Sequence, residues 1–362
     1  MAEESESNPA SVHEPTRANP TDLTGTTLGK YRLVEKLGQG GMAQVYKAYQ
    51  LDLERYVAIK VLHPHLTGDE EFAARFRREA RAIAALEHPH SVRVYDFDTD
   101  HDLAFIVMEY LPGASLKARL RELSCRNEYM PLAEAQHIIG ALADALEYAH
   151  ARGVIHRDIK PSNVLITNEG RPVLTDFGIA KMIDATIITG SSGSLGTPAY
   201  MSPEQAKGEP GDARSDIYAL GVMLYQLGTN HLPFDADTPY AIILKHLTAP
   251  LPPPRELRPD LPDAIERVIL KSLAKDPDDR YQTAGEMGQA IRAAITPAAN
   301  AGRARVSGLG KSALKRLRAH LSSLPRRTIL WQSAALIALT LLICIVLFWI
   351  SMPWRTQRYL AR

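Results

Sequence analysis

The chain has 362 residues, of which 45% are hydrophobic and 23% are charged, and its formal net charge is +1. This length holds one large domain or two ordinary ones, and the composition is that of a globular protein. Only two cysteines occur, Cys125 and Cys344. They exclude a disulfide framework, so we expect the bulk of the chain to reside in a reducing cytosol.

The first segment, residues 1–30, is rich in Glu, Ser, Thr, Pro and Asn and offers almost nothing to bury. Such a composition is typical of a disordered segment. The segment starts with MAEESESNPA, which is acidic and has no apolar region, so we expect no signal peptide here.

Residues 31–111 have the pattern of a small sheet with one helix. The helix is predicted because Phe72, Phe76, Ile83 and Leu86 share one face of its sequence. The predicted elements are two strands within 31–50 joined by a glycine turn, a strand at 52–62, the helix at 69–86, and strands around 91–97 and 103–109.

Beyond Pro112, helical periodicity dominates. Helices are predicted at 132–151, 216–227, 239–247, 262–273 and 283–293. A small sheet followed by a mostly helical part predicts the α+β class.

A glycine-rich turn, GQGGMAQV (38–45), joins the first two predicted strands. Glycines let a backbone approach a phosphate closely and point N–H groups at it. Turns of this kind are also common in ordinary hairpins, so a phosphate site and a structural turn both remain open from this stretch alone.

Lys60 lies among apolar neighbours in VAIK, on the third predicted strand. Glu79 lies on the apolar stripe of the following helix, and a carboxylate that faces a core needs a cation. We therefore expect a Lys60–Glu79 ion pair from strand to helix, which would leave the ammonium able to hold phosphate oxygens.

VIHRDIKPSNVLI (154–166) places acid, base, imidazole and amide groups between two apolar runs. A polar loop between buried elements is one interpretation. Eighteen residues after Asp158, Asp176 ends an apolar strand, where it can share a divalent cation with Asn163.

The C-terminal part is strongly basic. Between Arg303 and Arg362 there are eleven Lys and Arg and no acid, which leaves 31 basic and 41 acidic residues in the first 302. This asymmetry predicts an acidic soluble part and a basic tail with a separate task.

Within this tail, residues 329–350 are uncharged and mostly apolar, and Trp331 and Trp349 lie near the two ends. Such a length predicts a transmembrane helix, with a buried core helix as the alternative. Because eight basic residues precede the span and three follow it, we expect a single-pass protein of the cytoplasmic membrane. Its long N-terminal part would lie in the cytoplasm, with a short tail of residues 351–362 outside.

The predicted linker 296–328 contains KSALKRLRAHL (311–321), with three leucines on one helical face. It either lies on the anionic inner leaflet or merely flanks the span, and the sequence leaves both open.

Several motifs occur in an order and spacing that resembles eukaryotic-like protein kinases: the glycine-rich turn, VAIK, a helix glutamate, HRDIKPSN (156–163), DFG (176–178) and SPE (202–204). GTPAYMSPEQ (196–205) and HPHSVRVYDF (88–97) resemble bacterial membrane-anchored serine/threonine kinases. The resemblance covers about 31–295, and it implies a bilobal protein kinase fold with a small lobe at 31–111 and a large lobe at 112–295.

The resemblance implies catalytic roles residue by residue. Asp158 resembles the aspartate that orients the substrate hydroxyl and accepts its proton, and Lys160 the lysine that steadies the γ-phosphate in serine/threonine kinases. Lys60, held by Glu79, would grip the α- and β-phosphates of ATP. These groups fit a reaction that depends on positioning and charge neutralisation.

The resemblance also implies the cofactors. Asn163 and Asp176 would hold Mg²⁺, with Mn²⁺ as a possible substitute. Met108 would guard the back of the adenine site, and Glu109 to Leu111 would form the hinge. The residues expected around ATP are Leu37, Gly38, Gln39, Gly40, Gly41, Met42, Ala43, Gln44, Val45, Ala58, Lys60, Met108, Glu109, Leu111 and Leu165.

Regulation is implied as well. Arg157 would bind a phosphorylated residue of the activation loop, and the predicted autophosphorylation sites are Thr189 and Ser191. Thr197 would bond Asp158 and Lys160. For the remaining structural residues, Asp216 would brace the catalytic loop and Arg280 would pair with Glu204.

Two residues depart from the family pattern. Ala43 stands where a third glycine is usual, for which we expect slightly altered nucleotide affinity, and Ser202 stands where the APE element has alanine.

Two other functions remain as alternatives: a pseudokinase scaffold that binds nucleotide without transfer, and a small-molecule kinase. Lys60, Glu79, Asp158, Asn163 and Asp176 are all present, which argues against the scaffold. A hydroxyl-rich activation segment argues against a small-molecule kinase. The expected partners are protein substrates, the cytoplasmic membrane and a second copy paired through the small lobe, with no nucleic acid.

Overall fold

The computed structural model describes residues 22–41, 43–63, 78, 80–100, 103–177 and 198–295. Within these ranges, no helix is long and apolar enough to cross a bilayer. The predicted span at 329–350 lies outside them.

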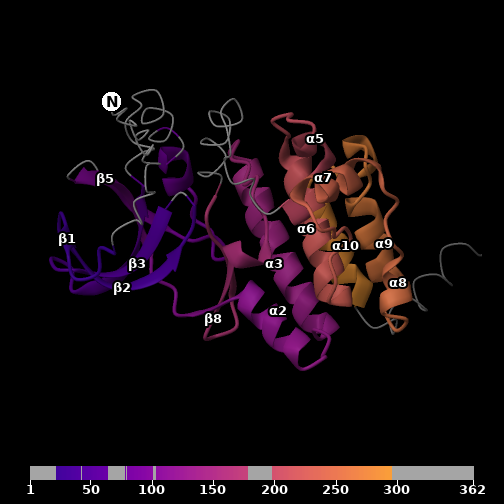
Figure 1. Ribbon diagram of the computed structural model, residues 1–362, viewed down its shortest axis with the longest axis horizontal. Coiled ribbons are helices and arrows are strands. Elements are labelled where there is room, and N and C mark those ends of the chain that lie inside the picture. Colours follow the sequence, from indigo (N-terminus) through magenta and orange to yellow (C-terminus); the bar gives the residue numbers. More distant parts are fainter. Residues whose placement is uncertain are drawn as a thin grey trace, which may run out of the picture. The chain divides into compact units, whose positions relative to one another are not determined.

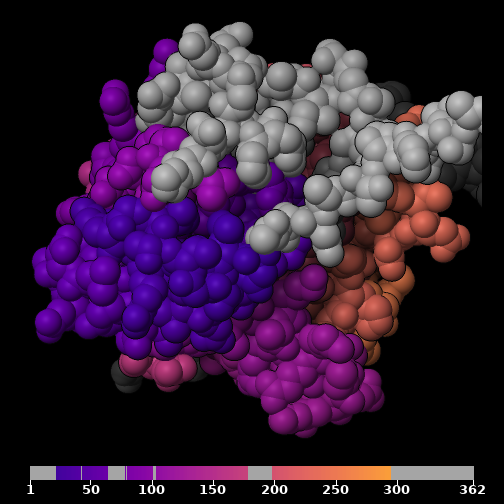
Figure 2. Space-filling model, turned by 60° about the vertical axis from the view of Figure 1, so that its left-hand side comes forward, coloured from indigo at the N-terminus to yellow at the C-terminus, as the bar shows by residue number. Residues whose placement is uncertain are grey.

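Six strands of the described chain form one antiparallel sheet (Figure 1), in the order β1-β2-β3-β4-β6-β5. The strands are β1 (Thr27–Leu28), β2 (Tyr31–Gln39), β3 (Ala43–Gln50), β4 (Arg55–Leu62), β5 (Val94–Asp100) and β6 (Leu103–Glu109). Figure 2 shows their residues, coloured indigo to purple, as one continuous surface. One stretch of chain therefore builds the small lobe.

Both faces of this sheet are covered at its centre, which explains why strands β4 and β6 are mostly apolar. Ala58 and Leu62 on β4 belong to the main core cluster, whereas Val57, Ile59 and Val61 belong to a second cluster on the other face. Side chains alternate between the faces of a strand. Lys60 therefore lies on the face that carries Ala58 and Leu62, toward the main core.

The rest of the described chain is mostly helical, as predicted. Its helices are α2 (Leu116–Cys125), α3 (Leu132–His150), α5 (Pro203–Ala206), α6 (Ala213–Thr229), α7 (Pro239–Thr248), α8 (Pro254–Leu257), α9 (Asp263–Ser272) and α10 (Ala284–Ile295). Three 3₁₀ turns occur among the described residues, η2 (Pro161–Asn163), η3 (Pro198–Tyr200) and η4 (Pro277–Asp279). The short strands β7 (Gly113–Ser115), β8 (Val164–Thr167) and β9 (Pro172–Leu174) form an antiparallel sheet.

Helix α6 is central to the large lobe. It packs against α3 and α9, and α10 packs against α3, α6 and α9 (Figure 1). Nearly all of its side chains are buried, including Ile217, Leu220 and Leu224. A helix that is apolar all round has to be enclosed on every side.

Local signals set where the helices start and stop. The Asp212 carboxylate accepts the N–H of Arg214 at the start of α6, and Asn230 ends that helix in the left-handed region at φ 63°. Thr238 accepts the N–H of Ala241 and is followed by Pro239 at the start of α7. These residues are typical helix caps.

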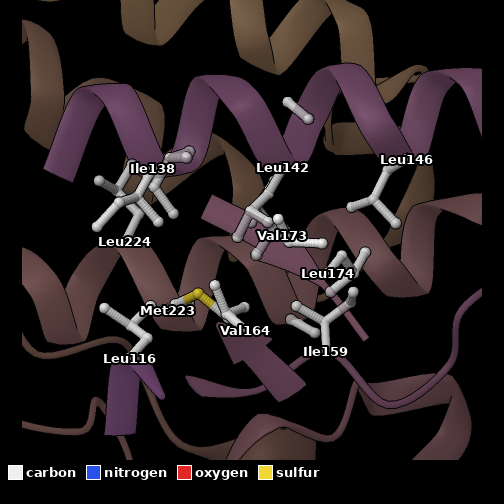
Figure 3. Packing of buried hydrophobic residues seen from close by; sticks show 14 of the residues in the cluster. Leu116, Ile138, Leu142, Leu146, Ile159, Val164, Val173, Leu174, Met223 and Leu224 are labelled. Atoms are coloured by element: carbon white, nitrogen blue, oxygen red, sulfur yellow. The ribbon is translucent and has the colours of Figure 1, made fainter. Parts of the chain in front are cut away.

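The main core brings α3, α6 and the short strands together. Leu142 and Leu146 of α3 approach Val173 and Leu174 of β9, and Met223 of α6 approaches Val164 of β8 (Figure 3). These contacts position β8 and β9, between which the chain turns, and the segments that precede and follow them carry the candidate site.

The predicted α+β class is confirmed. The strand predicted at 91–97 begins at Val94, because the backbone of the residues before it bonds to the large lobe: the N–H of Val92 donates to the carbonyl of Leu174 at 2.9 Å. Of the helix predicted at 69–86, residues 78 and 80–84 are helical, and residues 85–86 are not. Residues 69–77 and 79 lie outside the described residues.

Candidate active site

Lys60 and Asp176 connect the two lobes. Nζ of Lys60 lies 2.8 Å from Oδ1 of Asp176, which follows β9. Burial raises the pKa of the Asp176 carboxyl, but the charge and the hydrogen bond of Lys60 outweigh burial and lower it. Asp176 is therefore ionised at neutral pH and holds the ammonium in place.

Asp158 lies in the loop before η2 and has two polar neighbours from its own loop. Nζ of Lys160 lies 2.7 Å from its Oδ2, and Nδ2 of Asn163 donates to the same oxygen at 3.0 Å. Nδ2 of Asn163 also donates to the carbonyl of Asp158 at 2.8 Å. The amide nitrogen is thereby committed to Asp158, so Oδ1 of Asn163, which accepts a bond from the Ser162 hydroxyl at 3.4 Å, is the atom of that side chain that could hold a cation.

Asp216, near the start of α6, braces this loop. Its carboxylate is 1% exposed and accepts the N–H groups of His156 at 2.8 Å and of Arg157 at 2.7 Å. Nε2 of His150, at the end of α3, lies 2.8 Å from the same carboxylate. The two N–H groups immediately before Asp158 are therefore held by one buried acid.

Two residues here have left-handed backbones that non-glycine residues rarely adopt. Arg157 has φ 63° and Asp176 has φ 60°. Such conformations cost about 1–3 kcal/mol each and persist only where the surroundings impose them. At Arg157 the bonds to Asp216 supply that constraint.

His156 joins the two acidic segments. Its Nε2 lies 2.9 Å from the carbonyl of Thr175, and its ring lies 4.7 Å from the ring of Phe177, which follows Asp176. The N–H of Thr175 donates to the carbonyl of Asn163 at 2.8 Å. The residues before Asp158 and around Asp176 thus form one rigid unit.

The glycine-rich turn is open. A Cβ added to Gly38 or Gly41 would meet no atom within 4 Å, and one added to Gly40 would meet only the carbonyl of Ala43, at 3.7 Å. None of the three has a positive φ. The fold itself therefore does not require glycine at these positions, which leaves room for a ligand to approach the backbone.

The predicted adenine residues divide into two groups. Ala58 and Met108 are paired across β4 and β6, are buried in the main core together with Leu111, and have Leu165 packed against that core. Val45 is paired with Lys60 across β3 and β4. Leu37 is 45% exposed and belongs to neither core. In the glycine-rich turn, Gln39 and Gln44 face each other at the ends of β2 and β3. In the predicted hinge, the N–H of Glu109 donates to the carbonyl of Arg93.

Glu204 and Arg280, which the sequence pairs, form a buried bidentate ion pair. Nη1 and Nη2 of Arg280 each lie 2.8 Å from one oxygen of Glu204, and the hydroxyl of Ser215 donates to that carboxylate at 2.6 Å. Burial raises the pKa of Glu204, but the hydrogen bonds from Arg280 and Ser215 outweigh it and lower the pKa to about 2.

The departure at Ser202 has a local explanation. The Ser202 hydroxyl accepts the N–H of Gln205, and the Gln205 side chain accepts the N–H of Ser202, which is a capping box for α5. Nε2 of Gln205 also donates to the carbonyl of Arg157 at 3.3 Å. His150, Gln205 and Ser215 were not predicted from the sequence, although the Ser-x-x-Gln spacing indicates the cap.

Several predicted residues lie outside the described chain: Met42 of the turn, Glu79 of the predicted ion pair, Thr189 and Ser191 of the activation loop, and Thr197. The Lys60–Glu79 pair stays a prediction.

The geometry has close parallels among known proteins. The family model described as "Protein kinase domain" matches residues 31–290. The chain is 43% identical over 267 residues to the serine/threonine-protein kinase PrkC of Bacillus subtilis. The matched region covers 74% of this chain and 41% of the relative. It is 42% identical over 263 residues to the serine/threonine-protein kinase PknB of Mycobacterium leprae, covering 71% of this chain and 42% of the relative.

Solved structures of kinase domains have a similar fold. The crystal structure of the Mycobacterium tuberculosis PknI kinase domain has a TM-score of 0.60 and 32% sequence identity, and the match covers 75% of this chain and 98% of that one. The chain spans about two-fifths of the length of the first curated relatives it matches.

The Glu204–Arg280 pair yields a stability prediction. Replacing Arg280 with Met leaves a buried carboxylate without its cation, so the free energy of unfolding at pH 7 should fall by about 3–5 kcal/mol. Because the pKa of Glu204 is lower in the folded than in the unfolded chain, the pair stabilises the fold above pH 4.5 and less as the pH falls toward about 2. The difference between parent and variant, measured by urea denaturation, should shrink over that range.

The matched control is Arg214→Met, because Arg214 pairs with Asp212 and Asp278 near the surface. We expect a loss of about 1 kcal/mol or less there. Equal losses in the two variants would show that burial of the Glu204–Arg280 pair makes no special contribution.

Proposed function

The chain belongs to the protein kinase family, and we propose that it is an active enzyme that transfers the γ-phosphoryl group of ATP to serine and threonine hydroxyls of proteins. One observation carries the proposal: Lys60 pairs with Asp176, Asp158 contacts both Lys160 and Asn163, and the backbone next to Asp176 bonds to that of Asn163. Phosphoryl transfer requires this set of cations, metal ligands and one acid. A pseudokinase scaffold is not favoured, because Lys60, Asp158, Asn163 and Asp176 are all present.

The family implies ATP and a divalent cation, and we propose Mg²⁺, with Mn²⁺ as a substitute. Carboxylate and amide oxygens are the ligands that Mg²⁺ prefers, and it is usually bound by one or two carboxylates together with substrate phosphates. Asp176 and Oδ1 of Asn163 fit this donor set. Among the described residues, no group of three or more His, Cys, Asp or Glu side chains offers an alternative site. When bound, the cation would neutralise charge on the phosphates.

The protein's own residues perform the remaining work. Asp158 lies where it can orient a hydroxyl and accept its proton, and Lys160 beside it supplies a positive charge for the transferred group. Lys60 is held by Asp176 and can bind phosphate oxygens from the sheet side. Asp216 keeps the backbone before Asp158 from moving during the reaction.

We also propose the organisation of the whole chain. A kinase domain at 31–295 would be followed by a basic linker at 296–328, a membrane-spanning helix at 329–350 and an outer tail at 351–362. The apolar span, the tryptophans at its ends and the excess of basic residues before it support a single-pass protein of the cytoplasmic membrane with a cytoplasmic kinase domain.

Pairing of two molecules through their small lobes is a further proposal. Exposed apolar residues support it: Leu51 and Leu53, in the turn between β3 and β4, are 50% and 60% exposed, and Tyr56 on β4 is 50% exposed. A sedimentation measurement on Leu53→Asp in detergent would test it.

The roles of Asp158 and Lys60 yield a prediction for catalysis. Asp158→Asn keeps the size of the side chain but removes the proton acceptor, so kcat for transfer to protein should fall by about two to four orders of magnitude. Lys60→Met should also abolish transfer. Transfer is measured with labelled ATP and Mg²⁺, and melting curves check the fold. Asp263→Asn, an exposed acid on α9, is the matched control and should behave as the parent.

Another prediction concerns activation. Nε of Arg157 is buried and makes no hydrogen bond in the structure as described, and a phosphate is the best partner for such a guanidinium. Replacing Thr189 and Ser191 together with Ala should lower transfer to an added protein severalfold while ATP binding persists. Arg157→Met should lower the activity of the parent but add little in the alanine variant.

Thr186 and Ser194, from the same loop, provide the control pair of alanine substitutions. If the Thr189/Ser191 variant matches the parent and mass spectrometry finds the parent's loop unmodified, activation by loop phosphorylation is wrong.

A further prediction concerns the membrane. The full chain should remain with membranes after alkaline carbonate extraction, and a chain that ends at 328 should be released. Leu339→Arg places a charge at the centre of the span, at a cost of about 2.5–3.5 kcal/mol, and should weaken insertion. Retention of the truncated chain would disprove the assignment of 329–350 as the anchor.

A further inference from the structure

Three tyrosines line up at one end of the six-stranded sheet, where the chain leaves it for the predicted hinge. Tyr49 on β3 is paired with Tyr56 on β4, and their ring centroids lie 5.3 Å apart in an edge-on arrangement. Tyr110 directly follows β6, and its ring centroid lies 6.5 Å from that of Tyr56. The three rings therefore form an aromatic row that crosses β4.

The ammonium group of Lys47, on β3, lies over two rings of this row. Its Nζ is 4.4 Å from the ring centroid of Tyr56 and 4.9 Å from that of Tyr110. A cation over the face of a tyrosine is attracted by the negative charge of the ring face. Lys47, Tyr56 and Tyr110 thus form a lysine–tyrosine cluster that connects β3 to the predicted hinge across β4.

The strand register places this cluster on the side of the sheet where ATP is expected. Lys47 is paired with Ala58, which belongs to the main core, and residues directly opposite each other in an antiparallel sheet share a face. Tyr46 and Ala48, on either side of Lys47, belong to the core cluster on the other face. Lys47 therefore lies on the same face as Lys60, the cation proposed to bind phosphate oxygens.

The cluster also continues a connection that the backbone does not. The pairing of β6 with β4 ends at Glu109, which is opposite Val57, and the chain then leaves the sheet. Tyr110 is the next residue and the middle one of the predicted hinge. Beyond the last ladder pair, the contacts of the Tyr110 ring with Lys47 and Tyr56 hold the hinge to the sheet.

We propose that Lys47 is a positioning residue for the nucleotide: through its contact with the Tyr110 ring it holds the predicted hinge against the sheet beside Ala58, and so keeps the two sides of the adenine site in register. The inference rests on the proposed kinase function. It adds a residue that the sequence did not place around ATP, and Lys47 need not touch the nucleotide, because it acts through Tyr110.

The experiment measures nucleotide binding to the full chain in detergent, by titration calorimetry with ADP and Mg²⁺. Lys47→Met keeps an unbranched side chain of similar length but removes the charge. The Kd for ADP should rise about twofold to fivefold, as expected for the loss of a cation–π contact at a partly exposed site. An unchanged Kd would overturn the inference.

Lys47→Arg is the rescue variant, because a guanidinium also stacks on aromatic faces. It should bind ADP nearly as tightly as the parent. An arginine variant as weak as Lys47→Met would show that the cation over the rings is not what matters, and would overturn the inference.

The small lobe offers a matched control in Arg55, whose guanidinium lies 4.1 Å from the ring centroid of Tyr95. Arg55 directly precedes Tyr56 on β4, so it lies on the opposite face of the sheet, away from the proposed ATP site. Arg55→Met also loses a cation–π contact, but it should bind ADP as the parent does. If it weakens ADP binding as much as Lys47→Met, the effect is a general loosening of the small lobe, and the inference is wrong.

A double-mutant cycle tests whether Lys47 acts through Tyr110. Tyr110→Leu should weaken ADP binding by a factor similar to that of Lys47→Met, and the double variant should be no weaker than the weaker single variant. Tyr110 is chosen because Tyr56 also belongs to the surface proposed for pairing. Factors that simply multiply in the double variant would show that the two residues act independently, which would contradict the proposal.

Transfer kinetics with a histone as the protein substrate separate this inference from the proposed function. In Lys47→Met the KM for ATP should rise with the Kd for ADP, whereas the KM for the histone should not follow. A parent that binds ADP but transfers no phosphate would overturn the proposed function, while the binding data would still decide the role of Lys47. A parent that binds no nucleotide would overturn both.

Discussion

One buried carboxylate organises the candidate active site. Asp216 accepts the backbone N–H groups of His156 and Arg157 and lies 2.8 Å from Nε2 of His150. It thereby holds Arg157 in a left-handed conformation that the chain would not adopt by itself. Asp158 follows directly, so its position depends on a bond made by its neighbours. Because α6 is enclosed by the large lobe, the brace is as rigid as the core, and rigid support of this kind is what a reaction based on positioning requires.

The second organising contact runs between the lobes. Lys60 belongs to a strand whose two faces are both covered, and strand alternation directs it toward the large lobe. There it meets Asp176, whose own segment is tied to His156 through Thr175 and Phe177. The cation that would bind phosphate and the acid that would bind metal are thus fixed relative to each other before any ligand arrives. Such preorganisation is the main contribution that a protein can make to phosphoryl transfer.

Helix α6 serves two parts of the large lobe at once. Asp216 near its start braces the loop that carries Asp158, and Tyr218, two residues on, contacts His246 on α7. The first contact holds the loop before Asp158, and the second holds α7, which packs against η3 and α5. The Glu204–Arg280 pair holds α5 from the other side. A helix buried on all sides can connect these regions because none of its turns is free to move independently.

The sequence predicted the α+β class, most of the helices and the types of side chain at the site. These features follow from apolar periodicity, caps and the spacing of motifs, which are local properties. The capping box at Ser202 was readable in the same way. The resemblance to protein kinases already implied that Arg280 pairs with Glu204, 76 positions away, whereas only the tertiary structure decided that Lys60 meets Asp176, 116 positions away. The sequence gives no sign of the roles of His150 and His246, because the letters around a helical histidine are the same whether its ring faces solvent, a carboxylate or a hydroxyl. Burial and distance through space arise from the packing of the whole chain, and no local pattern encodes them.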